Sequence, residues 1–220
     1  MSCVLFIEED VEYSLFTRSR NKYFESGESR SSKLKCSIDS VDEKHYLLRV
    51  YDLASREYRF NNLDLVDLDT MVMYTMINPI DKKLTHKHLL NKLRTKGTQQ
   101  NLTRAVRSSQ FKNRRRVYYS MDFDVANKEA LTQKDISRIA ALEKKLDDLG
   151  LVPEWTIETR NGWHVLIKDS EHVTKIVVES NLVKWCADID TTLAYEMPSP
   201  LPGTWQNKFK VAFYKGYIKI

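Results

Sequence analysis

Two aspartates separated by one residue, Asp122 and Asp124, end an apolar run that begins at Val117. If this run is a β-strand, side chains two positions apart lie on the same face, so both carboxylates lie together and Phe123 lies on the opposite face. Mg²⁺ and Mn²⁺ prefer carboxylate oxygens, and a bound cation relieves the repulsion between two like charges. The alternative is an exposed strand end with two ordinary acids. When an Asp-x-Asp pattern stands alone, this alternative is the more frequent one.

A histidine follows a tight turn later in the chain. Arg160, Asn161 and Gly162 form the expected turn, since Asn-Gly is a strong hairpin signal, and His164 opens the next strand. An imidazole at this place can donate to a phosphate oxygen or take part in proton transfer. Gly162 allows another backbone to approach closely. The alternative is a hairpin histidine with a structural hydrogen bond.

Two further groups carry weaker signals. Asp188 and Asp190 stand where a helix ends or a strand starts, and a rigid turn at 202–203 is followed by Thr204 and Lys208. Hydroxyl and ammonium groups after such a turn can bind an anion. Taken separately, these groups are also compatible with a surface acid cluster and a proline-rich loop.

The elements that must position these residues follow an α/β pattern in the second half of the chain. Thr132 can cap the first helix and Gly150 can end it. We expect strands at 117–125, 154–158 and 164–168, helices at 132–149 and 173–185, a rigid proline-rich turn at 196–203 and a closing strand pair at 209–220.

The first half of the chain is less regular. Leucines at helical spacing predict a helix that Thr85 caps and Gly97 ends, followed by a short helix starting at Asn101 or Thr103. Before them we expect a strand at 3–7, a loop at 26–35, a hairpin at 44–59, and an apolar run at 66–76 that is either a strand or a short helix.

Residues 81–116 are strongly basic, with fourteen Lys, Arg and His residues and one acid, Asp81. Such a segment can follow a nucleic-acid backbone, with an affinity that depends on salt. The alternative is a solvated helix face that balances acids elsewhere in the chain. The candidate nucleic-acid contacts are Arg104, Arg107, Lys112, Arg114, Arg115 and Arg116.

Composition narrows the class of protein. The 220 residues have a net charge of +5, a mild excess that is compatible with an anionic partner. The three cysteines form no Cys-x-x-Cys pair, so we expect neither a zinc finger nor a disulfide framework, and a reducing compartment fits. The sequence has no signal peptide and no apolar run of membrane-spanning length, so we expect a soluble, cytoplasmic protein without a membrane partner.

Taken in order along the chain, the motifs resemble the archaeo-eukaryotic primase superfamily, particularly the primase-polymerases of plasmids, phages and other mobile elements. Asp122 and Asp124 match the first motif, Gly162 and His164 match the second, and Asp188 matches the third, with Asp190 as the runner-up. The Pro-Gly-Thr loop matches one that many members carry. The resemblance covers roughly residues 115–212. The chain departs from the family in three ways: no Arg stands directly before the Pro-Gly-Thr loop, the family's zinc-binding stem is absent, and the first 110 residues match no motif.

The resemblance implies an α+β fold: a primase-polymerase core with an RRM-like mixed sheet and flanking helices, plus a β-containing N-terminal lobe. The expected segments are an N-terminal lobe at 1–80, a basic helical segment at 81–116 and a catalytic core at 117–220, or all three as one domain. The implied activity is template-directed nucleotidyl transfer in DNA replication, as a DNA primase or primase-polymerase.

The resemblance also implies a site. Two Mg²⁺ or Mn²⁺ ions would be held by Asp122, Asp124 and Asp188, and the nucleotide would be held by His164, Arg160, Thr204 and Lys208. The implied partners are a single-stranded DNA template, nucleoside triphosphates, and a helicase or other replication protein.

Other classes of protein remain open from the sequence. A catalytically silent primase-like module would bind nucleic acid without polymerising. A metal-dependent nuclease or a sugar-nucleotide transferase would use the Asp-x-Asp pair but leave the histidine strand and the Pro-Gly-Thr loop unexplained. A non-enzymatic replication-assembly protein would use its acids to bind a partner.

Overall fold

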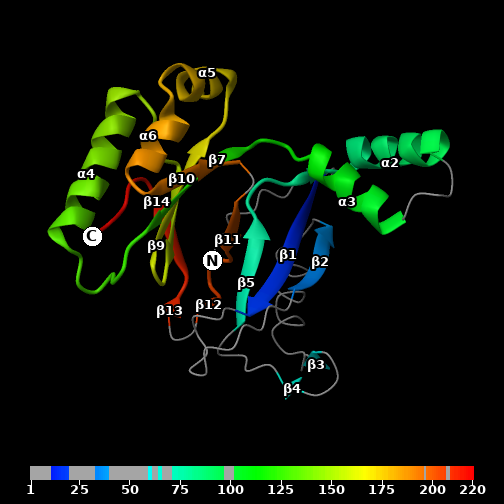
Figure 1. Ribbon diagram of the computed structural model, residues 1–220, viewed down its shortest axis with the longest axis horizontal. Coiled ribbons are helices and arrows are strands. Elements are labelled where there is room, and N and C mark those ends of the chain that lie inside the picture. Colours follow the sequence, from blue (N-terminus) through cyan, green and yellow to red (C-terminus); the bar gives the residue numbers. More distant parts are fainter. Residues whose placement is uncertain are drawn as a thin grey trace.

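The described residues form two five-stranded antiparallel sheets and two short strand pairs (Figure 1). The computed structural model describes residues 11–19, 33–39, 59–60, 64–65, 71–96, 102–195, 197–206 and 209–220. The first sheet has the strand order β11-β5-β1-β2, with β6 paired to β1. Its strands are β1 (Val11–Ser19), β2 (Lys33–Asp39), β5 (Met71–Met76), β6 (Ile80–Asp81) and β11 (Pro198–Pro200).

The second sheet has the order β10-β7-β9-β8-β14 and carries the candidate chemistry. Its elements alternate as β-α-β-β-α-β, a split βαβ arrangement, with a fifth strand added at one edge. They are β7 (Tyr118–Asp124), α4 (Gln133–Asp148), β8 (Trp155–Thr159), β9 (Gly162–Lys168), α5 (Glu171–Glu179), α6 (Leu182–Asp188), β10 (Thr191–Ala194) and β14 (Ala212–Lys215). The expected α+β class is confirmed, whereas the expectation of a mixed sheet is wrong, since its pairs are antiparallel.

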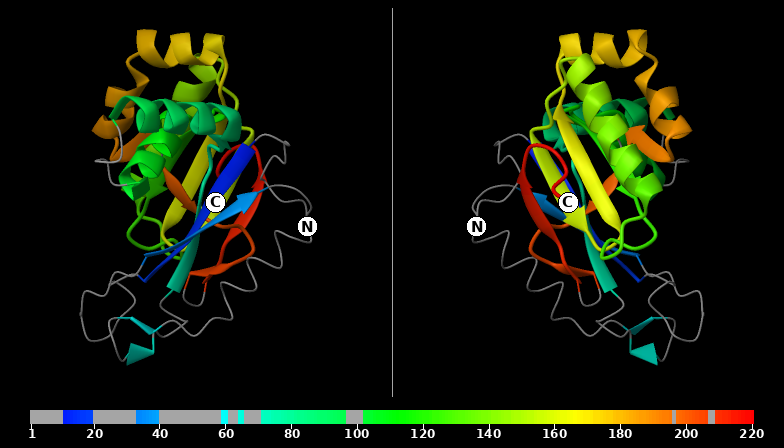
Figure 2. Two further views of the ribbon diagram at one scale, coloured as in Figure 1. Left: turned by 90° about the vertical axis from the view of Figure 1, so that its right-hand side faces the viewer. Right: turned by 90° about the vertical axis from the view of Figure 1, so that its left-hand side faces the viewer.

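Strand β7 is buried on both faces up to Met121 because each face meets a separate apolar cluster. Tyr119, Met121 and Phe123 belong to the larger cluster, which includes Ile139 and Leu142 of α4. Helices α4, α5 and α6 cover this face (Figures 1 and 2). Side chains at the alternate positions lie on the opposite face, where Tyr118 packs in a second cluster with Ile77, Ile157, Leu166 and Val211.

Helix α4 confirms the expectation for 132–149. The Thr132 side chain accepts from the Asp135 N–H, and the Asp135 carboxylate accepts from the Thr132 N–H, which completes a capping box. Gly150 follows the helix with φ +65°, the left-handed conformation that glycine adopts most readily.

The second expected helix, 173–185, is wrong as a single element. The chain forms α5 and α6 instead, and Asn181 between them has φ 51°. Asparagine tolerates the left-handed conformation better than most residues, and one such residue interrupts the α-helical hydrogen bonds.

The two sheets are joined by a buried asparagine, Asn78. Its side-chain amide donates to the carbonyls of Tyr118 (2.8 Å) and Tyr195 (2.6 Å), and its oxygen accepts from the N–H groups of Val117 and Tyr118. A buried amide satisfied in this way is costly to remove. Strand β11 adds a second connection between the sheets. It follows β10 of the second sheet in the chain, and it pairs with β5 of the first sheet.

Helices α2 (Lys82–Lys96) and α3 (Leu102–Lys112) confirm the two helices expected in the basic segment. The expected cap is wrong: Thr85 lies inside α2, and the carboxylate of Asp81 accepts from the Leu84 N–H at 2.8 Å. Asp81 is the residue directly before the helix, where a carboxylate can reach the first orphan N–H groups. None of the helices in the described part of the chain is long and apolar enough to span a bilayer.

The C-terminal segment differs from expectation in two places. Residues 198–200 form the edge strand β11 instead of a turn, which proline tolerates because an edge strand leaves N–H positions unused. Residues 209–220 do not pair with each other: β13 (Phe209–Lys210) pairs with β12 (Trp205–Gln206), and β14 pairs with β8.

The run at 66–76 ends as a strand, because β5 spans Met71–Met76. The strand expected at 3–7, most of the hairpin expected at 44–59, Gly97 and Asn101 lie outside the described residues. Of the loop expected at 26–35, residues 26–32 also lie outside them, and the expectation is wrong for 33–35, which belong to β2. The described residues also include the short strand pair β3 (Arg59–Phe60) and β4 (Asp64–Leu65).

Replacement of Gly162 by alanine tests the packing between β7 and β9. A Cβ at this position would lie 1.9 Å from the carbonyl oxygen of Phe123, so Gly162→Ala must separate the strands. We expect a loss of about 3 kcal/mol in the free energy of unfolding, measured by urea denaturation. The control is Gly150→Ala, where no atom lies within 4 Å and only the positive φ is strained, at about 1 kcal/mol. Equal losses in the two variants would contradict this account.

Candidate functional site

The site is built on the pairing of β7 with β9. Asp122 lies directly opposite His164 in the sheet, and the His164 Nε2 is 3.4 Å from the Asp122 Oδ1. The imidazole is nearly enclosed, with 8% of the side chain exposed, while 33% of the Asp122 side chain is exposed. The pair therefore presents a carboxylate to solvent with a buried imidazole behind it.

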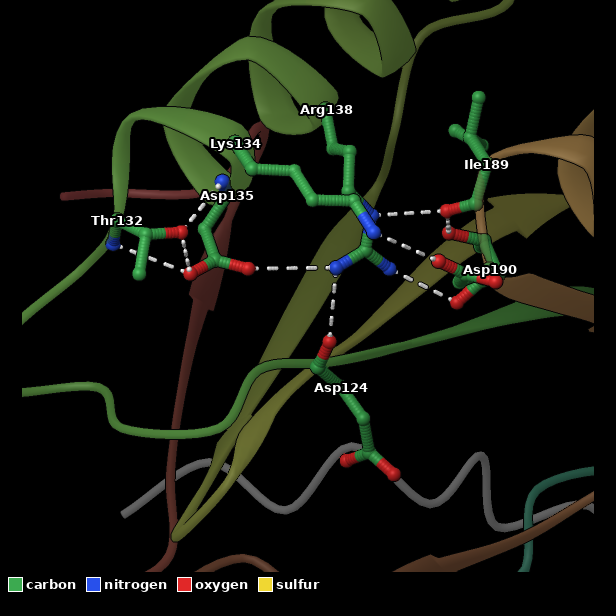
Figure 3. Close-up of polar contacts among 8 residues, drawn as sticks. Asp124, Thr132, Lys134, Asp135, Arg138, Ile189 and Asp190 are labelled. Carbon is green, nitrogen blue, oxygen red and sulfur yellow. Dashed lines mark hydrogen bonds and ion pairs between the residues drawn. The ribbon is translucent and has the colours of Figure 1, made fainter.

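Asp124 lies two residues further along β7 and is opposite Gly162. By strand alternation it shares a face with Asp122 and His164, away from the cluster of Phe123 and the helices. Asp124 is exposed, and its carboxylate points away from Arg138 (Figure 3). The structure thus brings Asp122, Asp124 and His164 together on one sheet face.

Gly162 is the residue that permits this arrangement. The backbone of β7 passes so close to it that any side chain would collide with the Phe123 carbonyl. The expectation that Gly162 allows close approach of another backbone is confirmed. The hairpin loop consists of Arg160 and Asn161, because Gly162 already pairs with Thr159.

Asp188 and Asp190, the two candidates for a third acid, lie on different elements. Asp188 is the exposed last residue of α6. Asp190 lies in the turn between α6 and β10: it has φ 53°, and its N–H donates to the Ala187 carbonyl. Its carboxylate forms an ion pair with Lys134 at 3.5 Å, and both side chains are largely exposed. The Asp190 carboxylate lies beside α4, whereas the Asp124 carboxylate points away from that helix (Figure 3).

Arg138 of α4 connects the strand ends that carry these acids (Figure 3). Its guanidinium donates to the carbonyls of Ile189 (2.9 Å), Asp190 (2.9 Å) and Asp124 (3.3 Å), and to the Asp135 carboxylate (3.4 Å). It also lies 4.4 Å from the centre of the Phe123 ring. Only 13% of this side chain is exposed. Sequence reasoning missed this residue, because its helical spacing does not reveal which carbonyls it reaches.

The charge of Asp135 supports the same network. Hydrogen bonds from the Thr132 side chain and backbone, together with the Arg138 charge, hold the pKa of Asp135 below its usual value. The carboxylate therefore stays ionised beside the guanidinium and helps to fix its orientation.

The Pro-Gly-Thr loop is anchored by its own backbone. Gly203 has φ +85°, its N–H donates to the Val211 carbonyl, and the Thr204 hydroxyl donates to the Leu201 carbonyl at 2.6 Å. Lys208 lies outside the described residues. The expected anion-binding hydroxyl of Thr204 is thus engaged within the loop.

The loop reaches the β8–β9 hairpin through Gln206, a residue that sequence reasoning missed. The buried Gln206 side chain accepts from the Arg160 N–H at 2.7 Å. This contact places the adjacent Trp205, which is 56% exposed, beside the hairpin that carries Arg160. Arg160 itself is exposed. Exposed indoles and arginines are both common on surfaces that bind nucleobases.

Lys128 also escaped sequence reasoning. Its ammonium group forms an ion pair with Glu158, donates to the Thr159 carbonyl at 3.0 Å and lies 4.0 Å from the centre of the Phe209 ring. It connects the segment after β7 to the end of β8 and to β13. Its role here is to hold the hairpin in place.

The candidate nucleic-acid contacts at 104–116 differ in their positions and in the contacts that they make. Arg104, Arg107 and the exposed Lys112 lie on α3. Arg115 donates to the Asp81 carboxylate at 3.2 Å, and Arg116 lies 4.6 Å from the centre of the Tyr195 ring. Arg114 is half-buried. Arg115 and Arg116 therefore make contacts within the fold.

A pair of strand carboxylates suits hard divalent cations, because carboxylate oxygens are their preferred ligands. Within the described residues no group of three or more His, Cys, Asp and Glu side chains has metal-binding geometry. The metal-ligand assignments stay predictions. The chain matches no protein-family model, no curated protein and no solved structure.

Removal of the Arg138 guanidinium tests whether it holds the strand ends together. We expect Arg138→Met to lower the free energy of unfolding by about 2 kcal/mol, because it removes the donor of three strand-end carbonyls and the charged partner of the Asp135 carboxylate. Amide exchange at Thr191 and Phe123 should accelerate more than exchange at Val165, in the middle of β9. The control is Lys145→Met on the same helix. Unchanged exchange at the strand ends would contradict this role.

Proposed function

We propose that the chain is a template-directed nucleotidyl transferase of the primase-polymerase type. The observation that carries the proposal is the facing of Asp122 on β7 and His164 on β9, with Asp124 on the same sheet face. The motif residues that are far apart in the sequence meet on adjacent strands. A surface acid cluster or a structural hairpin histidine would not require this meeting.

The donor set fits Mg²⁺ or Mn²⁺. Asp122 and Asp124 would hold the ions, with Asp188 as the third acid and Asp190 as the alternative. When bound, two such ions neutralise the charge of a triphosphate and favour ionisation of an attacking 3′-hydroxyl. The Lys134 contact with Asp190 is exposed, so it costs little to break.

His164 would donate to a phosphate oxygen of the incoming nucleotide and, in addition, orient the Asp122 carboxylate. A hydrogen bond from a neighbouring side chain commonly fixes the orientation of a carboxylate that binds a metal. Arg160 and the exposed Trp205 would contact the nucleotide or the template base. In this reaction the 3′-hydroxyl attacks the α-phosphorus and pyrophosphate leaves, so the protein contributes mainly position and charge.

A second candidate function is a catalytically silent primase-like module that binds nucleic acid during replication. The observation that favours it is the ion pair between Asp190 and Lys134, which uses a candidate metal ligand within the protein. Both candidates share the fold and differ in whether the acids support a reaction.

The decisive variant is Asp122→Asn/Asp124→Asn. The wild type should synthesise and extend primers on single-stranded DNA with Mn²⁺ and mixed ribo- and deoxyribonucleotides. The variant should lose at least about a thousandfold in rate, because it lacks the metal-binding charge. Its DNA affinity should be unchanged or tighter, since negative charge is removed.

The control for this experiment is Asp148→Asn/Glu179→Gln, which neutralises two exposed acids on α4 and α5. It should keep the wild-type rate. Product from the Asp122 and Asp124 variant would refute the proposed site. If neither protein makes product while both bind DNA, the silent module becomes the better account.

His164→Ala separates nucleotide binding from template binding. We expect the Kd for a nucleoside triphosphate to rise about tenfold, the effect of losing one charge-assisted hydrogen bond, while the Kd for single-stranded DNA stays within twofold. Titration calorimetry and fluorescence anisotropy measure the two constants. His172→Ala, an exposed histidine on α5, is the control. Equal losses for both ligands would assign His164 a folding role.

A further inference from the structure

Helix α2 carries an excess of positive charge that its own stability does not explain. Six of its residues are Lys or Arg, two are His, and none is acidic. The whole chain has a net charge of +5, so the residues outside α2 are together close to neutral. Residues 102–116 carry six more Lys and Arg residues and no acid, so α2 holds half of the Lys and Arg residues of the basic segment 81–116.

This distribution opposes the rules that stabilise isolated helices. Lys82 and Lys83 lie at the N-terminal end, where the helix dipole favours negative charge. Lys83 and Lys87 are four residues apart, a spacing at which like charges repel. The acid next to the helix, Asp81, is already engaged with the Leu84 N–H and with Arg115. Local electrostatics that oppose stability in this way are expected at functional surfaces.

Three exposed cations of α2 lie along one stripe of the helix surface, together with an exposed leucine. At 100° per residue, Lys83, Lys87, Leu90 and Arg94 fall within a sector of about 60° and extend over about 16 Å. All four are exposed, and Leu90 has 54% of its surface accessible. The buried residue of α2, Thr85, lies on the opposite side of the helix. In the left view of Figure 2, α2 lies in front of the strands, on the outside of the described structure.

We propose that this stripe binds the phosphate backbone of a nucleic acid. Its length matches about five phosphates of one strand at 3.4 Å each. Membrane binding fits less well, because the exposed Leu84 and Leu93 lie on opposite sides of α2 and make no separate apolar face. The stripe replaces Arg115 and Arg116, which are engaged within the fold, as the principal backbone contact. It does not depend on Asp122 and Asp124 being catalytic.

The test is Lys83→Gln/Lys87→Gln/Arg94→Gln in the full chain. Fluorescence anisotropy with a labelled single-stranded oligodeoxynucleotide, in EDTA and without nucleotide, removes any dependence on the metal or on synthesis. We expect the Kd at about 0.1 M salt to rise at least tenfold, and the slope of log K against log salt to fall in magnitude by about 2. Lys87→Gln alone should lower the slope by about 0.7. Glutamine is a good helix former, so far-UV circular dichroism should stay unchanged.

The matched control is Lys144→Gln/Lys175→Gln/Lys184→Gln, which removes three exposed cations from α4, α5 and α6. It should bind DNA within about twofold of wild type, because charges outside the contact add little in salt. Equal losses in the two triple variants, or no DNA binding by the wild type, would overturn the proposal. So would binding to vesicles of anionic phospholipid that depends on the stripe while DNA binding does not. Loss of synthesis in the Asp122 and Asp124 variant, with DNA binding retained, would leave the proposal standing.

Discussion

The close approach of the Phe123 carbonyl to Gly162 is the constraint on which the candidate site depends. A strand register that shifts by one residue turns every side chain to the other face of the sheet. The contact at Gly162 favours the observed register, because the close approach of the Phe123 carbonyl in this register requires a residue without a Cβ at position 162. With the register fixed, Asp122 faces His164, and the apolar residues of β7 face the helices.

Buried polar side chains hold the ends of these strands, where the sheet itself gives the least support. Arg138 donates to the backbone at the end of β7 and before β10, and Asn78 joins the start of β7 to the end of β10. Both act on carbonyl groups, so they position the backbone and leave the carboxylates of Asp122 and Asp124 to other ligands. Such fixed scaffolding is what a site needs if its rate depends on position and charge.

The arrangement separates chemistry from long-range attraction. Asp122 and Asp124 lie on the second sheet, while α2, with six Lys and Arg residues and no acid, lies at the upper right of Figure 1, away from that sheet. Cations placed next to Asp122 and Asp124 would form ion pairs with them, as Lys134 does with Asp190. A basic helix at a distance can hold an anionic polymer without neutralising the carboxylates.

The sequence by itself determined the elements with strong local signals: the capped helix α4, the Asn-Gly hairpin, strand β7 and the α+β class. It also identified Asp122, Asp124, Gly162 and His164, because period-two alternation and turn chemistry act between near neighbours. Only the tertiary structure decided the break at Asn181, the role of residues 198–200 as an edge strand, the contacts of Arg138, and the ion pair of Asp190 with Lys134. These features depend on partners distant in the chain, and no local pattern specifies which backbone groups a folded chain will bring within hydrogen-bond distance.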